Sequence, residues 1–132
     1  MGIDFTHKKI KDNEETAHWS YGGFNRFREK LAKEVGIANL NEMDGWKTDT
    51  GNHLGKYIEG ISWSKIKHPI KYLLNHSDCD GQISAKRCGE LADIIYFLVS
   101  KWNIDDYDRQ QGQILALNMK MCHKKNVPLI FL

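Results

Sequence analysis

The apolar pattern between residues 85 and 102 constrains the fold of this chain more than any other part of the sequence. Apolar side chains recur there at spacings of three and four residues, which places them on one face of an α-helix. Ser84 precedes the run and is a preferred helix-capping residue. The pattern therefore predicts a core helix over about 85–102. Its apolar face carries Leu91, Ile94, Ile95, Leu98, Val99 and Trp102.

Two further helices follow from the same reasoning. One is predicted over about 106–124, because Asp105 or Asp106 stands at a capping position before a run of inward-facing residues. The other is predicted over about 22–35, where Gly36 is placed to end the helix in a left-handed conformation. The inward-facing residues of the two helices are Tyr107, Ile114, Leu115, Asn118, Met121 and Cys122, and Phe24, Phe27, Leu31 and Val35.

The two ends of the chain and one proline predict smaller elements. A short helix is expected over 68–74, because the sequence His-Pro at its start puts proline at the favoured first position. Residues 128–132 are apolar and predict a terminal strand that can pair with a short strand at 3–5. The polar stretch 7–16 is expected to be a mobile loop.

Residues 38–66 have no helical period. Glycines recur at short intervals there, with aromatic residues between them, so a long irregular loop region is expected. Short strands are predicted within it at 57–59 and 61–63. Taken together, the patterns predict a mainly α-helical single domain over 1–132. It has about four helices, a small terminal β element and a long glycine-rich loop.

Composition excludes several classes of protein. The chain has 132 residues, enough for one domain, and a formal net charge of +2, which offers no general basis for binding nucleic acid. No apolar run is long enough to cross a membrane, and the charged start is unlike a signal peptide. The cysteine count is odd and there is no CxxC pair, so intracellular, unreactive thiols are favoured. The three are Cys79, Cys88 and Cys122.

Arg28 is the most informative exception within its predicted helix. At about 100° per residue it lies about 40° from Phe24, inside the apolar face, whereas Arg26 points to solvent. An unpaired buried charge costs several kcal/mol, so Arg28 must meet a carboxylate or an anionic ligand. A structural ion pair is favoured, with Asp78 or Asp80 as the preferred partner. The alternative is a pocket in which the planar guanidinium holds a phosphate or carboxylate group.

The segment at the start of this helix carries a second candidate feature. Gly22 and Gly23 would expose backbone N–H groups, which attract anions at a helix start. Trp19 and Tyr21 could supply flat stacking surfaces beside them, and with Arg28 they would form a nucleotide-sized site. No GxGxxG, GKS or GKT motif is present. The favoured interpretation is therefore that the aromatic residues fill the core and the glycines permit close packing.

A polar segment between two predicted helices is the third candidate feature. If Gly81 is aligned with position 6 of a calcium-binding loop, Asp78 and Asp80 fall on ligand positions, but His76 and Arg87 occupy the first and last ones. An arginine opposite the ion would oppose binding, so a polar corner between helices is favoured over a calcium site. His76, Asp78 and Asp80 remain candidate ligands of a divalent metal. Clusters of this kind are more often hydrogen-bonded turns.

Two strings of the sequence resemble a known family. They are HWSYGGFNRFR at 18–28 and LLNHSDCDG at 73–81, and a weaker similarity involves residues 106–108 and 115–116. They resemble a family of small uncharacterised proteins from bacterial, prophage and phage genomes. The similarity covers most of residues 17–131. No activity is established for that family. The resemblance implies a phage or prophage gene context and little chemistry. By analogy, small phage-borne accessory proteins often bind a host protein or a nucleotide signal without turning it over.

These observations predict a soluble, non-catalytic binding protein of the bacterial cytoplasm with no resident cofactor. Its partner is expected to be a small anionic, nucleotide-like ligand or a host protein, and its oligomeric state is left open. One alternative is a metal-dependent hydrolase or nuclease that uses His76, Asp78 and Asp80. Another is a structural phage component in which the aromatic residues only fill the core. The expected ligand-binding residues are Trp19, Tyr21, Gly22, Gly23, Arg28, His76, Asp78 and Asp80.

Overall fold

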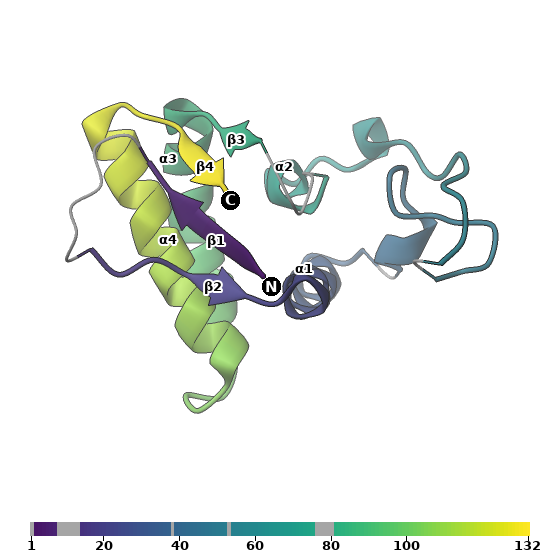
Figure 1. The fold of residues 1–132 in the computed structure, drawn as a ribbon, viewed down its shortest axis with the longest axis horizontal. Helices are drawn as coiled ribbons and strands as arrows, with labels where there is room; N and C mark the ends of the chain where they lie inside the picture. Colours follow the sequence, from purple (N-terminus) through teal and green to yellow (C-terminus); the bar gives the residue numbers. More distant parts are fainter. Residues whose placement is uncertain (1, 8–13, 38, 53, 76–80) are drawn as a thin grey trace. The chain divides into compact units, whose positions relative to one another are not determined.

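The computed structural model shows helices joined by short strands and irregular segments (Figure 1). It describes residues 2–7, 14–37, 39–52, 54–75 and 81–132. The chain divides into two compact units. The first unit consists of Met1–Phe27 and Ser77–Leu132, and the second unit consists of Arg28–His76. The single domain expected from the chain length stays a prediction.

The first unit contains the two longest helices, α3 (Ala85–Val99) and α4 (Tyr107–Lys125). Both were predicted from the sequence and both are confirmed. Ser84 caps α3, and Asp106 rather than Asp105 caps α4, because the side-chain oxygen of each accepts a backbone N–H from the first helical turn. Tyr107 was expected to face inward and is instead exposed. Its hydroxyl lies at the start of α4 and donates a hydrogen bond to a backbone carbonyl.

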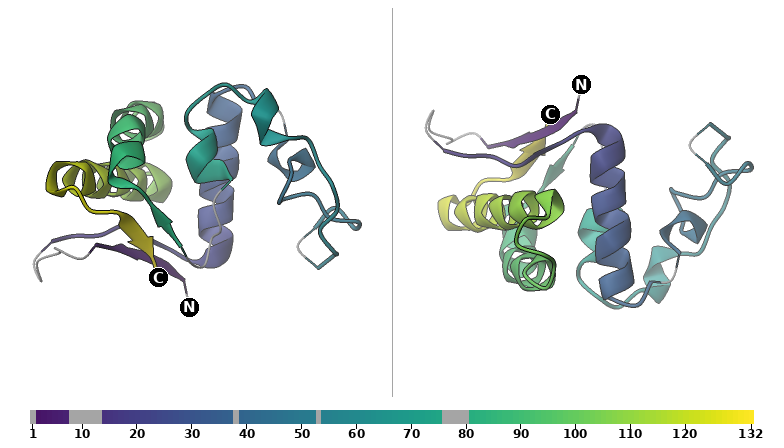
Figure 2. Two further views of the ribbon diagram at one scale, coloured as in Figure 1. Left: turned by 90° about the horizontal axis from the view of Figure 1, so that it is seen from above. Right: turned by 90° about the horizontal axis from the view of Figure 1, so that it is seen from below.

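A small antiparallel sheet lies on one side of this helix pair (Figure 2). The predicted pairing of the chain ends is confirmed, because Phe5 lies opposite Phe131 in the sheet. The two outer strands have only two residues each and were not predicted. The strand order is β2-β1-β4-β3. The strands are β1 (Ile3–Thr6), β2 (His18–Trp19), β3 (Gln82–Ile83) and β4 (Leu129–Phe131).

Five aromatic rings fill the core of the first unit beside the sheet. Helix α1 (Tyr21–Glu34) supplies two of them. The rings of Trp19 and Phe27 are stacked with their centroids 4.5 Å apart, whereas most of the other ring pairs meet edge to face. Such pairs contribute about 0.5–1.5 kcal/mol beyond the burial of their area. The five residues are Phe5, Trp19, Phe24, Phe27 and Phe131.

The second unit begins at Arg28 within α1 and is mostly irregular after that helix. Its only other described α-helix is α2 (Lys71–Leu74), which starts later than the predicted 68–74 helix. Two single 3₁₀ turns occur in the irregular segment, at Leu40–Glu42 and Trp63–Lys65. No helix among the described residues combines the length and the apolar character that a membrane span requires.

The strands predicted at 57–59 and 61–63 are wrong. Tyr57 forms a single antiparallel bridge with Thr48, and Ile61 forms a single parallel bridge with Met43. Each residue therefore pairs with an earlier segment of the irregular region and not with its neighbour across Gly60. A Cβ atom at Gly60 would meet the backbone of residues 42–44 at 2.7–2.8 Å, so glycine is required for this close approach.

Candidate functional site

Arg28 is buried within the second unit, as its position on the helix predicts. It is 2% exposed, and its guanidinium carbon lies 4.5 Å from the centroid of the Trp46 ring. Its Nη1 atom donates to the Leu73 carbonyl at 3.5 Å, and Trp46 Nε1 donates to the Leu74 carbonyl at 2.8 Å. A desolvated cation–π pair contributes about 2 kcal/mol. Arg28 and Trp46 therefore form a structural pair that holds the carbonyl end of α2.

The sequence predicted where Arg28 points but not the aromatic ring that it meets. Trp46 lies in the irregular segment, where no helical or strand period assigns a direction to a side chain. Asp78 and Asp80 were predicted as partners of Arg28, and His76 as a member of the same site. All three lie outside the described residues, so these assignments stay predictions.

Trp19 lies in the core, which is the interpretation that the sequence favoured over stacking on a ligand. It is 1% exposed, its ring is stacked on Phe27, and its Nε1 atom donates to Asp108 at 3.0 Å. Its surface is therefore almost entirely covered by the protein itself. The sequence pattern allowed this outcome, because an aromatic residue just before an amphipathic helix can belong to the core.

The glycine pair is also used within the fold. Gly22 and Gly23 lie in the first turn of α1, after the half-buried Tyr21. The N–H of Gly23 donates to the Ser20 hydroxyl at 3.0 Å, so this donor is not directed at an anion. A Cβ atom at Gly23 would lie 2.8 Å from the same hydroxyl oxygen. The glycine therefore permits close approach of the capping side chain.

One hollow in the second unit is too small and too polar for a typical small-ligand pocket. In the second unit, a polar hollow of about 240 Å³ lies between α1 and the first 3₁₀ turn. Pockets for drug-sized ligands have volumes of about 300–1,000 Å³ and are mostly apolar. Within the described residues no group of three or more histidine, cysteine, aspartate or glutamate side chains could hold a metal ion. The hollow is lined by Glu29, Lys33, Ile37, Asn39, Leu40 and Asn41.

Comparison of the chain with protein-family models, with curated proteins and with solved structures finds no match. The resemblance to small phage and prophage proteins stays a prediction.

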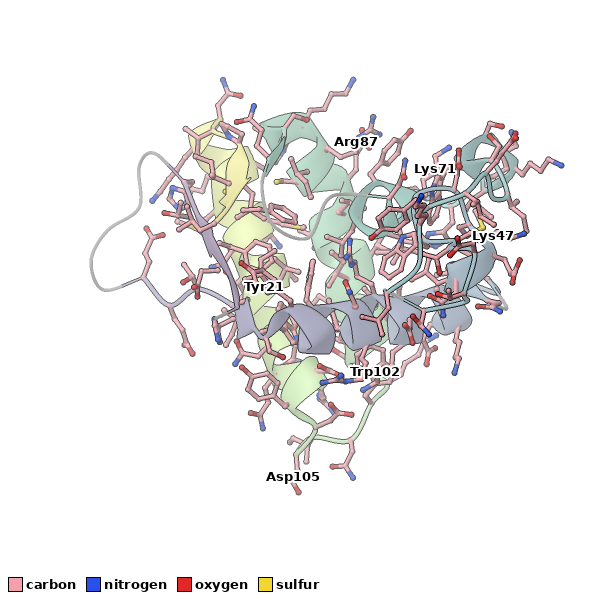
Figure 3. All side chains as sticks on the ribbon, turned by 45° about the vertical axis from the view of Figure 1, so that its right-hand side comes forward. Tyr21, Lys47, Lys71, Arg87, Trp102 and Asp105 are labelled. Carbon is pink, nitrogen blue, oxygen red and sulfur yellow. The ribbon has the colours of Figure 1, made fainter. Side chains whose placement is uncertain are left out.

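A hydrogen-bonded loop in the second unit is the strongest candidate for an interaction site. Its base is closed by backbone bonds from Ile58 N–H to the Lys47 carbonyl at 3.0 Å and from Asp49 N–H to the Lys56 carbonyl at 2.9 Å. The Asp49 carboxylate also accepts the N–H of Lys56 at 3.0 Å. Thr48 donates its hydroxyl hydrogen to the Asn52 carbonyl. Figure 3 labels Lys47 at this base. These bonds hold the two backbone segments at the base of the loop, 47–49 and 56–58, without a regular helix or sheet.

This loop exposes large apolar side chains to solvent. Leu54 is 82% exposed and Tyr57 is 71% exposed. Ile58 at the base of the loop and Ile61, three residues further on, are also exposed. All four side chains lie within residues 54–61. We name these four side chains the apolar loop surface. The sequence alone does not mark them as a site, because an apolar residue in an irregular segment cannot be assigned to the core or to the surface by its spacing.

A partly buried polar cluster in the first unit links the start of the chain to α4. His7 was expected in a mobile loop and is instead buried, while residues 8–13 lie outside the described part of the chain. Its Nε2 atom lies 3.0 Å from the Glu14 carboxylate, and Lys125 Nζ donates to the same carboxylate at 2.7 Å. The hydrogen bond from Lys125 is the main reason that the pKa of Glu14 lies below its ordinary value.

This cluster predicts a pH-dependent effect of the substitution Lys125→Met. A carboxyl group with a lowered pKa stabilises the fold above its ordinary pKa, and that stabilisation is lost as the pH falls through the lowered value. K125M should therefore reduce the melting temperature at pH 7, and the difference from the unsubstituted protein should shrink towards pH 3. The exposed neighbour Lys124 gives a matched control, K124M, which should change little. An equal loss for K125M at both pH values would contradict the role of Glu14.

Two of the three cysteines lie in the helices of the first unit. Cys88 and Cys122 are both buried, on α3 and α4. The hydrogen bond with Cys122, together with burial, raises the pKa of the Cys88 thiol, which disfavours its reactive thiolate form. Cys79 lies outside the described residues.

Proposed function

We propose that this chain is a non-catalytic binding protein whose partner is another protein, and that the apolar loop surface is the main contact. The observation that supports this most is the exposure of Leu54 and Tyr57 on a loop whose base is closed by hydrogen bonds. Exposed apolar side chains cost solubility, and where several lie together they commonly mark an interaction site.

The fixed backbone of the loop favours protein binding energetically. Ordering a flexible loop on binding costs affinity, and a loop that is already held in place avoids most of that cost. Tyrosine is enriched among the few side chains that dominate protein–protein affinity, and leucine can supply apolar area beside it. The proposed partner therefore presents an apolar groove able to take the Leu54 and Tyr57 side chains.

The sequence predicted either a protein partner or a small anionic ligand, and a protein partner does not need the residues that were expected to bind an anion. A small anionic ligand would need Arg28, which is held by Trp46, and Trp19, which is in the core. Its other expected contacts lie outside the described residues. The implied setting is the cytoplasm of a bacterial cell that carries a phage or prophage genome, and the partner is a host protein.

Substitution of the two most exposed loop side chains tests this function. The variant L54S/Y57S should keep the stability of the fold within about 0.5 kcal/mol, because both side chains lie in solvent. Affinity purification from cells should recover one partner with the unsubstituted protein and lose it with this variant. Against the purified partner, the dissociation constant should rise at least about 30-fold, as expected for the loss of contacts that dominate an interface.

A matched control separates this surface from general stickiness. I104S/L132S removes two other exposed apolar side chains, both in the first unit, and should leave binding unchanged. If the loop variant and the control bind the purified partner equally well, the loop is not the contact. If a panel of nucleotides raises the melting temperature and no protein partner binds, the small-ligand prediction replaces this one.

A further inference from the structure

The exposed face of α3 carries a stripe of three residues at a spacing of four. Phe97 lies at its centre and is 66% exposed, although the opposite face of the helix is buried in the core. Asp93 lies one turn before it, with a side chain that is 85% exposed. Lys101 lies one turn after it, and its Nζ atom is 4.8 Å from the centroid of the Phe97 ring. We name these three residues the α3 stripe.

The helical turn continues as far as Lys101, although α3 ends at Val99. The N–H of Lys101 donates to the Leu98 carbonyl at 3.3 Å. Each charged residue is therefore displaced about 6 Å along the axis from Phe97, in opposite directions, since a helix rises about 1.5 Å per residue. The stripe has the order acid, aromatic ring, base.

This order is self-complementary. When two copies of α3 pack antiparallel about a two-fold axis at Phe97, the ring meets its own equivalent. Asp93 of each copy then lies opposite Lys101 of the other. A two-fold interface of this kind uses the same patch on both copies, so the patch must be complementary to itself. An apolar centre with a charged rim is the usual anatomy of a protein interface.

Neighbouring side chains enlarge the apolar centre. Tyr96 lies beside Phe97 on α3 and is exposed. The contacts of Asp93 with Lys120 and of Gln113 with Ser100 set the antiparallel register of α3 and α4. That register places the exposed Leu117 of α4 opposite Tyr96.

We propose that the α3 stripe is the contact face of a symmetric homodimer. The inference goes beyond the proposed function and does not depend on it, because the stripe lies in the first unit and the apolar loop surface lies in the second. The occupant is a second copy of this chain, since the arrangement of the two charges around Phe97 matches its own rotated image.

Charge reversal tests this dimer through the contact between Asp93 of one copy and Lys101 of the other. The unsubstituted protein should show a concentration-dependent dimer by sedimentation between about 10 µM and 1 mM, the range of a small interface. D93K and K101D each place like charges opposite one another, and each should weaken the dimer at least about 10-fold. The double variant D93K/K101D restores opposite charges and should recover dimerisation to within about threefold of the unsubstituted protein.

Mixing the two single variants gives the sharpest result. The D93K protein carries two bases on the stripe and the K101D protein carries two acids, so a one-to-one mixture should form a heterodimer that neither protein forms alone. Circular dichroism and melting temperature would confirm that each variant is folded. F97S should abolish the dimer while leaving the fold intact.

Three results would overturn the dimer. The first is an unsubstituted protein that stays monomeric up to about 1 mM. The second is single variants that associate as well as the unsubstituted protein, and the third is a mixture of them that stays monomeric. L54S/Y57S should still dimerise, which separates failure of this inference from failure of the proposed function.

Discussion

Replacing Phe24 with alanine is expected to lower the free energy of unfolding by about 3–5 kcal/mol, the usual cost of emptying a buried phenylalanine site. Phe24 has no exposed surface and its ring meets those of Phe5, Trp19 and Phe27 at centroid distances of 5.4–6.2 Å. Four elements from both ends of the chain, β1, β2, α1 and β4, meet in this cluster. The substitution therefore leaves a cavity lined by side chains from several elements, and no single neighbour can move to fill it.

Phe97 gives the matched control for this experiment. The same substitution there removes an equally large ring that is mostly in solvent, so the free energy of unfolding of the monomer should change by no more than about 0.5 kcal/mol. Denaturant unfolding by circular dichroism and by tryptophan fluorescence would measure both variants. Equal losses for F24A and F97A would show that the aromatic cluster is not the core of the first unit.

Replacing Arg28 with alanine is expected to destabilise the second unit by about 2 kcal/mol or more, through loss of the cation–π contact and of packing by its buried stem. A double-mutant cycle with W46A isolates the contact between the two side chains. The coupling free energy should be about 1–2 kcal/mol, because the guanidinium group is shielded from water while the Trp46 ring is half-buried. Arg28→Lys should not rescue the loss, since an ammonium group does not stack as the planar guanidinium does.

This cycle also separates the structural role of Arg28 from a ligand-binding role. A structural arginine gives a stability loss in the absence of any ligand. If R28A left the melting temperature unchanged but removed a nucleotide-induced increase in it, the ligand role predicted from the sequence would be the correct one.

The helices of the first unit could be predicted because their signals are local and long. Helices α3 and α4 have 15 and 19 residues, so the apolar period repeats several times and a capping residue marks each start. The terminal strand could be predicted from its apolar run. The strands β2 and β3 could not, since two residues carry no period. They are strands only because β1 and β4 offer them partners.

The sites were predictable only where a regular element gives a direction. Arg28 lies on a helix, so its angle on the helical face predicted burial before any partner was known. Trp19 lies just outside that helix, and the sequence left open whether it stacks on a ligand or fills the core. Leu54 and Tyr57 have no period around them. Their exposure follows from backbone bonds between Lys47 and Ile58 that no local pattern reveals.

Photo-crosslinking from position 57 tests the proposed binding function most directly. A benzophenone amino acid would replace Tyr57 in cells that express the protein, with the same group at the exposed position of Ile104 as the control. We predict one discrete product between position 57 and a partner protein, which is absent from position 104 and lost when L54S is added. No product from position 57, or the same set of products from both positions, would contradict the proposal.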